Sequence, residues 1–237
     1  MTQEQSPTMR RIGLLGGMSW QSSVEYYRLV NDLVVQRLGG LHSADCLMYS
    51  VDFATIAALQ KAGRWEDAGK ILAAGARDLE AGGAELLVLC TNTMHIVADQ
   101  IEAAVSIPLL HLIDVTATAI KAAGLTTVGL LGTAFTMDAA FYRERLDSHG
   151  ITALVPDAAD RDLVHRIIYD ELCLGIVTEA SRDEYRAVIG RLIEAGAQGV
   201  ILGCTEIELL IDAGDSPVPV FPTTQLHAKA AVDAALD

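Results

Sequence analysis

The sequence predicts an α/β protein built from two pseudo-symmetric α/β domains, each with a mainly parallel sheet. Short runs of Val, Ile and Leu bounded by glycine alternate with longer segments that carry apolar residues at helical spacing. Two of these runs occur twice, since 12–17 is echoed by 128–133 and 83–89 by 196–202. Ligands of open parallel sheets bind beyond the carboxyl ends of the strands, so we expect the active site in the cleft between the two domains.

The first half is expected to form strands that alternate with helices. Continuous apolar runs are typical of parallel strands covered on both faces, and the glycine pairs at 39–40 and 82–83 mark the ends of two helices. The predicted strands are 12–16, 46–51, 86–90 and 108–110, and the predicted helices are 22–38, 65–81, 97–104 and 115–123.

The second half repeats this alternation with strands at 128–132, 200–203 and 218–220 and helices at 137–149, 162–174 and 182–195. We therefore expect an N-terminal α/β domain over 10–118 and a C-terminal α/β domain over 119–224. The polar segment 1–9 is predicted to be a flexible tail, and the helix 225–237 is predicted to pack on the N-terminal domain.

The strand that ends at Cys204 determines how the two halves correspond. Alignment of Gly83 on Gly196 gives an offset of 113 residues, which places Thr91 opposite Cys204 and leaves Cys90 opposite a glycine. Adjacent strand residues point to opposite faces, so Cys90 should point into packing if Thr91 and Cys204 enter the cleft. The two halves would then offer one hydroxyl and one thiol.

Composition excludes several classes of function. The net charge is −14 with 17 Lys and Arg against 31 Asp and Glu, so nucleic-acid and anionic-membrane surfaces are not expected. The apolar runs are too short to span a membrane. Four widely spaced cysteines without a CxxC pair, and the lack of a leader-like segment, indicate a reduced, cytoplasmic protein.

No cofactor or metal ion is expected. The glycines at 13, 16 and 17 lack the GxGxxG spacing of a dinucleotide fingerprint. The His and Cys spacings do not assemble a zinc site, and no lysine lies in a context typical of a pyridoxal phosphate Schiff base. The protein chain itself must then supply the chemistry.

Two proton-transfer groups on opposite sides of a small cleft suit racemisation, in which a proton leaves one face of a carbon and returns to the other. A thiol has a reference pKa of about 8.5. This pKa is expected to fall near neutral at a helix N-terminus, where Cys204 is predicted to lie. The Thr91 hydroxyl can donate a proton but is far too weak an acid to serve as a resting base. The predicted pair is chemically unequal.

Three motifs carry a resemblance to the aspartate/glutamate racemase family of cofactor-independent amino-acid racemases. They are 14–20 (LLGGMSW), 92–95 (NTMH) and 203–206 (GCTE). The family has two pseudo-symmetric α/β domains with the substrate bound between them, and its first-domain pattern Pro-Cys-Asn-Thr-x-His puts Thr91 where the first catalytic cysteine would be. The chain is especially similar to the broad-specificity or L-Asp/L-Glu-directed branch with a threonine and a cysteine. Glutamate racemases of cell-wall synthesis, with Asp-Ser-Gly and Gly-Cys-Thr-His motifs, match less well.

This resemblance implies roles for individual residues. Cys204 would remove the α-proton of the L-enantiomer, and Thr91 would reprotonate the opposite face. The residues expected to bind substrate are Met18, Ser19, Gln60, Asn92, Thr93, Thr133, Thr205 and Glu206. Of these, Asn92, Thr93 and Thr205 would hold the α-carboxylate. A lysine that the family tends to carry is replaced here by Leu163, and the partners implied are a small amino acid and a second copy in a homodimer.

Simpler interpretations and other functions stay open. Cysteine is often a packing residue, Thr91 and its neighbours can act only as caps or turn residues, and His95 can be a structural hydrogen-bonding group. A decarboxylase of disubstituted malonates shares the fold family and needs only one protonating thiol. A non-catalytic amino-acid-binding protein would keep the cleft without the first acid.

Overall fold

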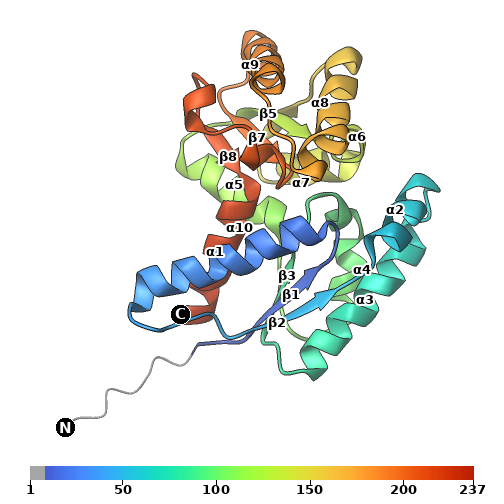
Figure 1. The fold of residues 1–237 in the computed structure, drawn as a ribbon, viewed down its shortest axis with the longest axis vertical. Helices are drawn as coiled ribbons and strands as arrows, with labels where there is room; N and C mark the ends of the chain where they lie inside the picture. Colours follow the sequence, from blue (N-terminus) through green and yellow to red (C-terminus); the bar gives the residue numbers. More distant parts are fainter. Residues whose placement is uncertain (1–8) are drawn as a thin grey trace. The chain divides into compact units, whose positions relative to one another are not determined.

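The computed structural model describes residues 9–237, which fold as two compact units (Figure 1). The first unit contains the described residues up to Cys90, together with Val97–Leu110 and His227–Asp237. The second contains Thr91–Ile96 and His111–Leu226. The tail expected over 1–9 lies outside the described residues except for Met9, which packs against the core of the first unit. No helix in the described part of the chain combines the length and the apolar character needed to cross a membrane.

The first unit is built on a parallel four-stranded sheet in the order β2-β1-β3-β4. Its strands are β1 (Ile12–Gly16), β2 (Cys46–Ser50), β3 (Leu86–Leu89) and β4 (Leu109–Leu110). Its helices are α1 (Trp20–Leu38), α2 (Phe53–Lys61), α3 (Trp65–Ala81), α4 (Ala98–Glu102) and α10 (Thr223–Leu236) from His227 onward.

Helices cover both faces of this sheet, which explains its continuous apolar strands. On one face α1 and α10 pack on β1 and β3, and Tyr26 and Ala231 lie in the same buried cluster as Leu14. On the other face α3 approaches closely at Gly75, where an added Cβ would lie 2.7 Å from the ring of Tyr49.

The second unit has the same architecture, with strand order β6-β5-β7-β8. Its strands are β5 (Thr127–Gly132), β6 (Thr152–Leu154), β7 (Val200–Gly203) and β8 (Val220–Pro222). Its α-helices are α5 (Leu112–Ala122), α6 (Ala134–Asp138), α7 (Ala140–Ser148), α8 (Ala158–Asp170) and α9 (Glu179–Glu194). Four short 3₁₀ segments follow strands or helices in the described residues: η1 (Thr93–Val97), η2 (Leu172–Leu174), η3 (Ile207–Leu209) and η4 (Ala213–Asp215).

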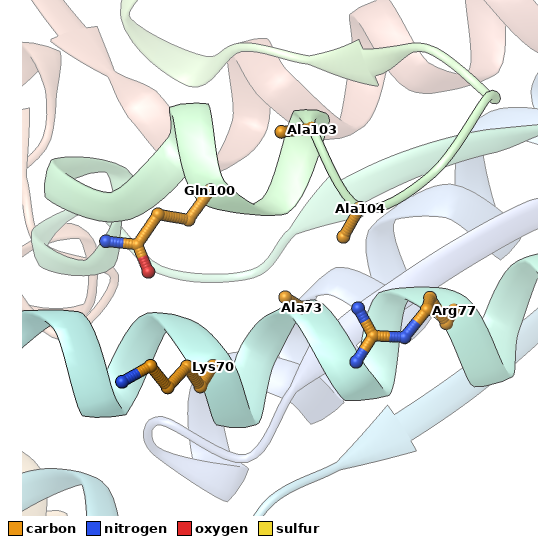
Figure 2. Close-up of a pocket in the computed structure, with 6 residues that line it drawn as sticks. All are labelled: Lys70, Ala73, Arg77, Gln100, Ala103 and Ala104. Atoms are coloured by element: carbon orange, nitrogen blue, oxygen red, sulfur yellow. The ribbon is translucent and has the colours of Figure 1, made fainter.

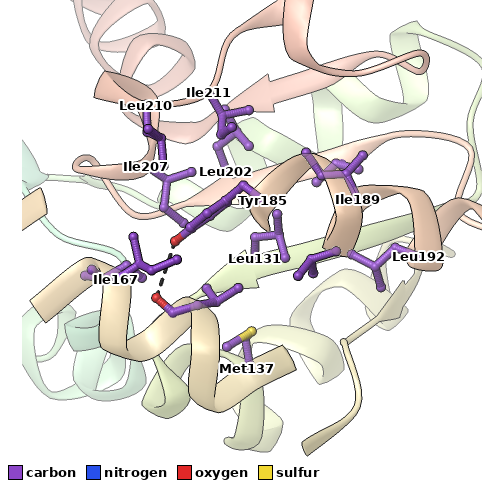
Figure 3. Packing of buried hydrophobic residues seen from close by; sticks show 14 of the residues in the cluster. Leu131, Met137, Ile167, Tyr185, Ile189, Leu192, Leu202, Ile207, Leu210 and Ile211 are labelled. Atoms are coloured by element: carbon purple, nitrogen blue, oxygen red, sulfur yellow. Dashed lines mark hydrogen bonds between the residues drawn. The ribbon is translucent and has the colours of Figure 1, made fainter. Parts of the chain in front are cut away.

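The core of the second unit packs α8 and α9 against the sheet (Figure 3). Leu131 and Leu202 come from neighbouring strands, and Ile189 and Leu192 come from α9. The fully buried Tyr185 satisfies its hydroxyl by donating to the carbonyl of Val164, at 3.4 Å. The sheet is thereby covered on this face.

The prediction of two pseudo-symmetric α/β domains with parallel sheets is confirmed. In the first sheet Leu15 pairs with Leu89, and in the second sheet Leu131 pairs with Leu202. Leu89 and Leu202 therefore occupy equivalent positions and are separated by the same 113 residues as Gly83 and Gly196 in the sequence.

Some predicted boundaries differ from the structure. The expected domain boundary at 118/119 falls inside α5, which groups with the second unit, as does the segment 91–96. The helix predicted over 137–149 is two helices, because Ala139 has an extended backbone with ψ 142°. The short elements α2 and β6 were not predicted, since neither carries a long apolar pattern.

Candidate active site

Cys204 follows the last residue of β7, as the sequence predicts. Its side chain is partly exposed, and Sγ lies 2.9 Å from Oε2 of Glu206, to which the thiol donates. The backbone of Glu206 has φ −67° and ψ −30°, so a tight turn brings the carboxylate back over the thiol two residues earlier.

The expectation of a thiol acidified by a helix N-terminus is wrong. The helix that follows, η3, is a 3₁₀ turn of three residues and lacks the aligned peptides of a longer helix. Burial and the negative charge of Glu206 instead raise the pKa of Cys204 well above the ordinary value of a thiol. The resting group is therefore a protonated thiol hydrogen-bonded to a carboxylate.

Thr91 lies two residues beyond the end of β3, at the position equivalent to Cys204. Its carbonyl accepts a hydrogen bond from Nδ1 of His95 at 2.8 Å. The hydroxyl of Thr91 makes no hydrogen bond to any other residue within 9–237, so it caps no described helix. The preceding Cys90 is fully buried in the core of the first unit, where burial raises its pKa.

Side-chain hydrogen bonds hold the segment that follows Thr91 in place within the second unit. Nδ2 of Asn92 donates to Oγ1 of Thr223 at 3.0 Å, and Oδ1 of Asn92 accepts from the hydroxyl of Tyr142 at 3.4 Å. Oγ1 of Thr223 in turn donates to the carbonyl of Leu202, two residues before Cys204. The side chain of Asn92 thus links the Thr91 segment to the strand that carries the thiol.

Three threonine hydroxyls form a second connection. Oγ1 of Thr93 lies 3.3 Å from Oγ1 of Thr133 and 3.1 Å from Oγ1 of Thr136. Thr133 is the N-cap of α6 and accepts from the backbone N–H of Thr136. The predicted site residues Thr93 and Thr133 are therefore in contact with each other.

Thr205 is also held by a neighbouring hydroxyl, because Oγ1 of Thr224 donates to it at 3.1 Å. Since the hydroxyls of Thr93 and Thr205 are already bonded, their backbone groups matter more for ligand binding. The N–H groups of Asn92, Thr93 and Thr205 donate to no other residue within the described range. Three backbone donors are thereby available to an anion.

The predicted site residues of the first unit are buried. Met18, Ser19 and Gln60 are each 9% exposed or less. Ser19 is the N-cap of α1, where Oγ accepts from the N–H of Ser22 at 3.2 Å. Gly17 has φ +92° just before it, and a Cβ there would lie 2.3 Å from the carbonyl oxygen of Val51, so this turn requires glycine.

Leu163, which stands at the expected lysine position, packs against the core of the second unit. Nδ1 of His165, two residues after Leu163, accepts a hydrogen bond from the N–H of Ala134 at 3.2 Å. Ala134 directly follows Thr133 in the sequence. The His165 ring lies 4.7 Å from the ring of Tyr169. Burial, followed by the nearby Cys204, raises the pKa of Tyr169 to about 12.

Sequence reasoning missed Tyr142 and Thr223 as parts of this network. Both lie far from the recognised motifs in the sequence, and a buried tyrosine or an N-terminal threonine of a helix is an ordinary packing or capping residue. Only their contacts with Asn92 assign them to the site.

Apart from these residues, the described part of the chain contains a cavity but no arrangement that could hold a metal ion. No group of three His, Cys, Asp or Glu side chains within residues 9–237 is arranged to hold a metal ion. A cavity of about 280 Å³ in the first unit lies between α3 and α4 (Figure 2). Its lining residues are Lys70, Ala73, Arg77, Gln100, Ala103 and Ala104, none of which belongs to the predicted site.

A family model and a curated relative that match this chain are both described as racemases. The family model described as Asp/Glu/Hydantoin racemase matches residues 15–231. The broad specificity amino-acid racemase RacX of Bacillus subtilis is 23% identical over 231 residues, which cover 93% of this chain and 96% of RacX.

Two solved structures are also similar. A candidate Asp/Glu racemase from Yersinia pestis is 55% identical with a TM-score of 0.91, over 97% of this chain and all of the other. An aspartate racemase homologue from Pyrococcus horikoshii OT3 is 33% identical with a TM-score of 0.86, over the same shares. The chain belongs to the Asp/Glu/hydantoin racemase family and is an isomerase of the racemase type.

Proposed function

We propose that the protein is a cofactor-independent racemase of aspartate, glutamate or a broader set of amino acids. Cys204 is the base for the α-proton of the L-enantiomer, and Thr91 is the donor to the opposite face. The sheet register carries this proposal, because it gives these two residues equivalent positions in the two halves. The proposal also includes a cytoplasmic homodimer whose product is a D-amino acid.

The resting thiol must lose its proton before it can act as a base. Glu206 is the acceptor at hand, since Oε2 lies 2.9 Å from Sγ. In the proposed sequence the proton of Cys204 moves to Glu206, and the thiolate then removes the α-proton of the L-amino acid. The role predicted for Glu206 in binding substrate thus becomes one of accepting this proton.

The carbanion formed in this step needs a positive environment at the α-carboxylate. The free N–H groups of Asn92, Thr93 and Thr205 supply it by donating to the carboxylate oxygens, as backbone donors do in oxyanion holes. Thr91 then donates its hydroxyl proton to the other face and recovers a proton from water. A hydroxyl is a much weaker acid than a thiol, so this second transfer should be slow.

The amino acids differ in what their side chains require. With Leu163 in the core, the cation that the family lysine would provide is missing at that position. His165, two residues after Leu163, accepts from the N–H of Ala134, which follows Thr133, and contacts the ring of Tyr169. We propose that it contributes to the choice of side chain.

One nuclear magnetic resonance experiment tests the function. L- and D-amino acids are incubated with the enzyme in deuterium oxide, and loss of the α-proton signal is followed together with inversion. We expect exchange with aspartate or glutamate, no exchange with Cys204→Ala, and retained exchange with the matched control Cys90→Ala.

The other outcomes identify other functions. Release of carbon dioxide from an arylmalonate, without α-proton exchange on any amino acid, would favour the decarboxylase. Thermal stabilisation by aspartate without exchange would favour an amino-acid-binding protein.

A further inference from the structure

A second cavity lies in the second unit, beside α7 and the edge strand β6. Its volume of about 330 Å³ is within the range typical of small-molecule sites. Its lining residues are Ala140, Arg143, Glu144 and Asp147 of α7, with Thr152 and Ala153 of β6. None of them belongs to the network around Thr91 and Cys204, so this cavity is a separate feature of the second unit.

Three charged side chains line the cavity without being paired. Arg143, Glu144 and Asp147 take part in no ion pair with any residue in the range 9–237. Arg143 and Asp147 are four residues apart, a spacing at which ion pairs commonly form on a helix, yet they do not contact each other. By contrast, Arg145 on the same helix is paired with Asp114 at 2.6 Å. The charges at the cavity are therefore available to a ligand.

The guanidinium of Arg143 lacks an acceptor for one of its N–H groups. Nη2 donates to the carbonyl of Asp138 at 3.3 Å, whereas Nε is buried and has no hydrogen-bond partner among the residues that the structure describes. Nε–H and the second N–H of Nη2 form a fork that can bind a carboxylate through two hydrogen bonds. Since a buried donor without an acceptor costs free energy, a small rotation of the guanidinium toward a carboxylate in the cavity would be favourable.

The two carboxylates of the cavity are placed to bind cations. Glu144 and Asp147 are three residues apart on α7, so their Cβ atoms lie about 5–6 Å apart on the same side of the helix. Both residues are exposed. One carboxylate can accept from an α-ammonium group and the other from a cationic side chain. The hydroxyl of Thr152, which is bonded to no other described residue, is a further polar contact.

The charges select the class of ligand. With two carboxylates and one guanidinium, the lining has an excess of negative charge. A zwitterionic amino acid matches Arg143 with its carboxylate and one acidic residue with its ammonium group, and a basic side chain neutralises the second acidic residue. An acidic side chain would instead lie against a like charge, which disfavours binding. The small side chains of Ala140 and Ala153 leave room for the methylene groups of the ligand.

We infer that the cavity between α7 and β6 is a binding site for a basic α-amino acid, with its carboxylate on Arg143 and its two cationic groups on Glu144 and Asp147. This site is separate from the one that holds the substrate in the proposed function, and it does not depend on the chemistry at Cys204.

Isothermal titration calorimetry of the full chain tests the ligand class. Cys204→Ala serves as the background, so that no turnover occurs during the titration. L-Arginine should bind. Agmatine lacks the carboxylate and Nα-acetyl-L-arginine lacks the α-ammonium group, so each should bind about tenfold more weakly or worse because one charge-assisted interaction is lost.

Substitutions in the cavity locate the binding. Arg143→Met, Glu144→Gln and Asp147→Asn should each weaken the binding of L-arginine by about tenfold or more, for the same reason. Glu184→Gln is the matched control, because Glu184 is an exposed glutamate on α9 that does not line the cavity. It should leave the affinity unchanged. Circular dichroism confirms that each variant is folded.

The outcomes separate this inference from the proposed function. No binding of L-arginine, equal affinities for L-arginine and agmatine, or full affinity in Arg143→Met and Asp147→Asn would each overturn the inference. α-Proton exchange is measured on the same cavity substitutions with Cys204 intact. Exchange at the wild-type rate in variants that have lost L-arginine binding supports two separate sites. Loss of exchange together with loss of binding would place L-arginine in the catalytic site and overturn the inference.

Discussion

Sγ of Cys204 lies 2.9 Å from Oε2 of Glu206, so the thiol and the carboxylate form one hydrogen-bonded unit. Glu206 is 6% exposed, and the negative charge of its carboxylate disfavours a second negative charge on the sulfur. Burial and, after it, the charge of Glu206 raise the pKa of the Cys204 thiol.

Glu206→Gln should separate these two effects. The amide retains the size of the side chain but carries no charge, so the pKa of Cys204 should fall toward the ordinary value of a thiol, while burial keeps it raised in part. The measurement is the pH dependence of thiolate ultraviolet absorbance, with Cys204→Ala subtracted as the baseline for the other cysteines. α-Proton exchange from the L-enantiomer should fall by about 10²-fold, typical of losing a proton-transfer group. An unchanged thiol pKa would remove Glu206 from this role.

Thr91 is tested by a pair of substitutions. Thr91→Cys places a stronger acid at the second position, and its thiolate forms far more readily near neutral pH than a threonine alkoxide, so exchange that starts from the D-enantiomer should rise by about tenfold or more. Thr91→Val removes the hydroxyl with little change of shape. With Cys204 intact, the L-enantiomer should still lose its α-proton to deuterium but should no longer invert. If Thr91→Val still racemises at the wild-type rate, another group protonates that face.

The internal repeat was the strongest source of correct structural predictions. Two glycines, Gly83 and Gly196, were enough to predict the equivalence of Leu89 and Leu202 that the strand register shows. Strand runs are visible in sequence because a parallel strand covered on both faces is apolar throughout.

Features that depend on polar contacts between distant residues could not be predicted. The start of α5 is determined by His111, whose Nδ1 accepts from the N–H of Ile113, and the helix is tied to α7 through Asp114 and Arg145. These polar contacts leave no trace in the hydrophobic periodicity of the sequence, so the expected domain boundary at 118/119 fell inside α5. The contact of Glu206 with the thiol could not be predicted either. It depends on a tight turn after the strand, whereas the sequence was expected to continue as a helix.

His95 lies beneath Thr91 and is 3% exposed. Nδ1 contacts the carbonyl of Thr91 at 2.8 Å, and Nε2 accepts from the N–H of Leu112 at 3.2 Å, which requires the proton on Nδ1. His95 therefore holds the backbone of Thr91 and is a positioning residue.

Two substitutions of His95, to Asn and to Gln, distinguish a role in positioning Thr91 from a role in packing alone. The amide of His95→Asn can replace Nδ1 and keep the bond to Thr91, whereas His95→Gln can replace only Nε2. Each should lower the free energy of unfolding by about 1–3 kcal/mol because one buried partner is lost. If the bond to Thr91 matters for chemistry, His95→Gln should lower kcat for inversion more than His95→Asn does, with KM similar in both. Equal kcat values would leave His95 a purely structural residue.

The ion pair between Asp114 of α5 and Arg145 of α7 should make the contact between these two helices sensitive to acid. Arg145 donates to both oxygens of its carboxylate, at 2.7 and 2.6 Å, and His149 lies 2.8 Å away. Hydrogen bonding from Arg145 holds the pKa of Asp114 well below its usual range. A lowered carboxyl pKa stabilises the fold above the unfolded-state value of about 4, and this stabilisation is lost as the pH falls through the folded-state value.

Asp114→Asn should therefore lower the free energy of unfolding by about 1 kcal/mol at neutral pH, a modest amount because both partners are more than one-third exposed. The difference from wild type should shrink as the pH falls below about 4, where the unfolded aspartate begins to bind a proton. Urea unfolding across a pH series measures both. Asp67→Asn is the matched control, since its more exposed pair with Arg64 joins neighbouring residues of one chain segment and should cost less. A difference for Asp114→Asn that stays constant from neutral to acid pH would show that its carboxylate charge does not stabilise the contact between α5 and α7.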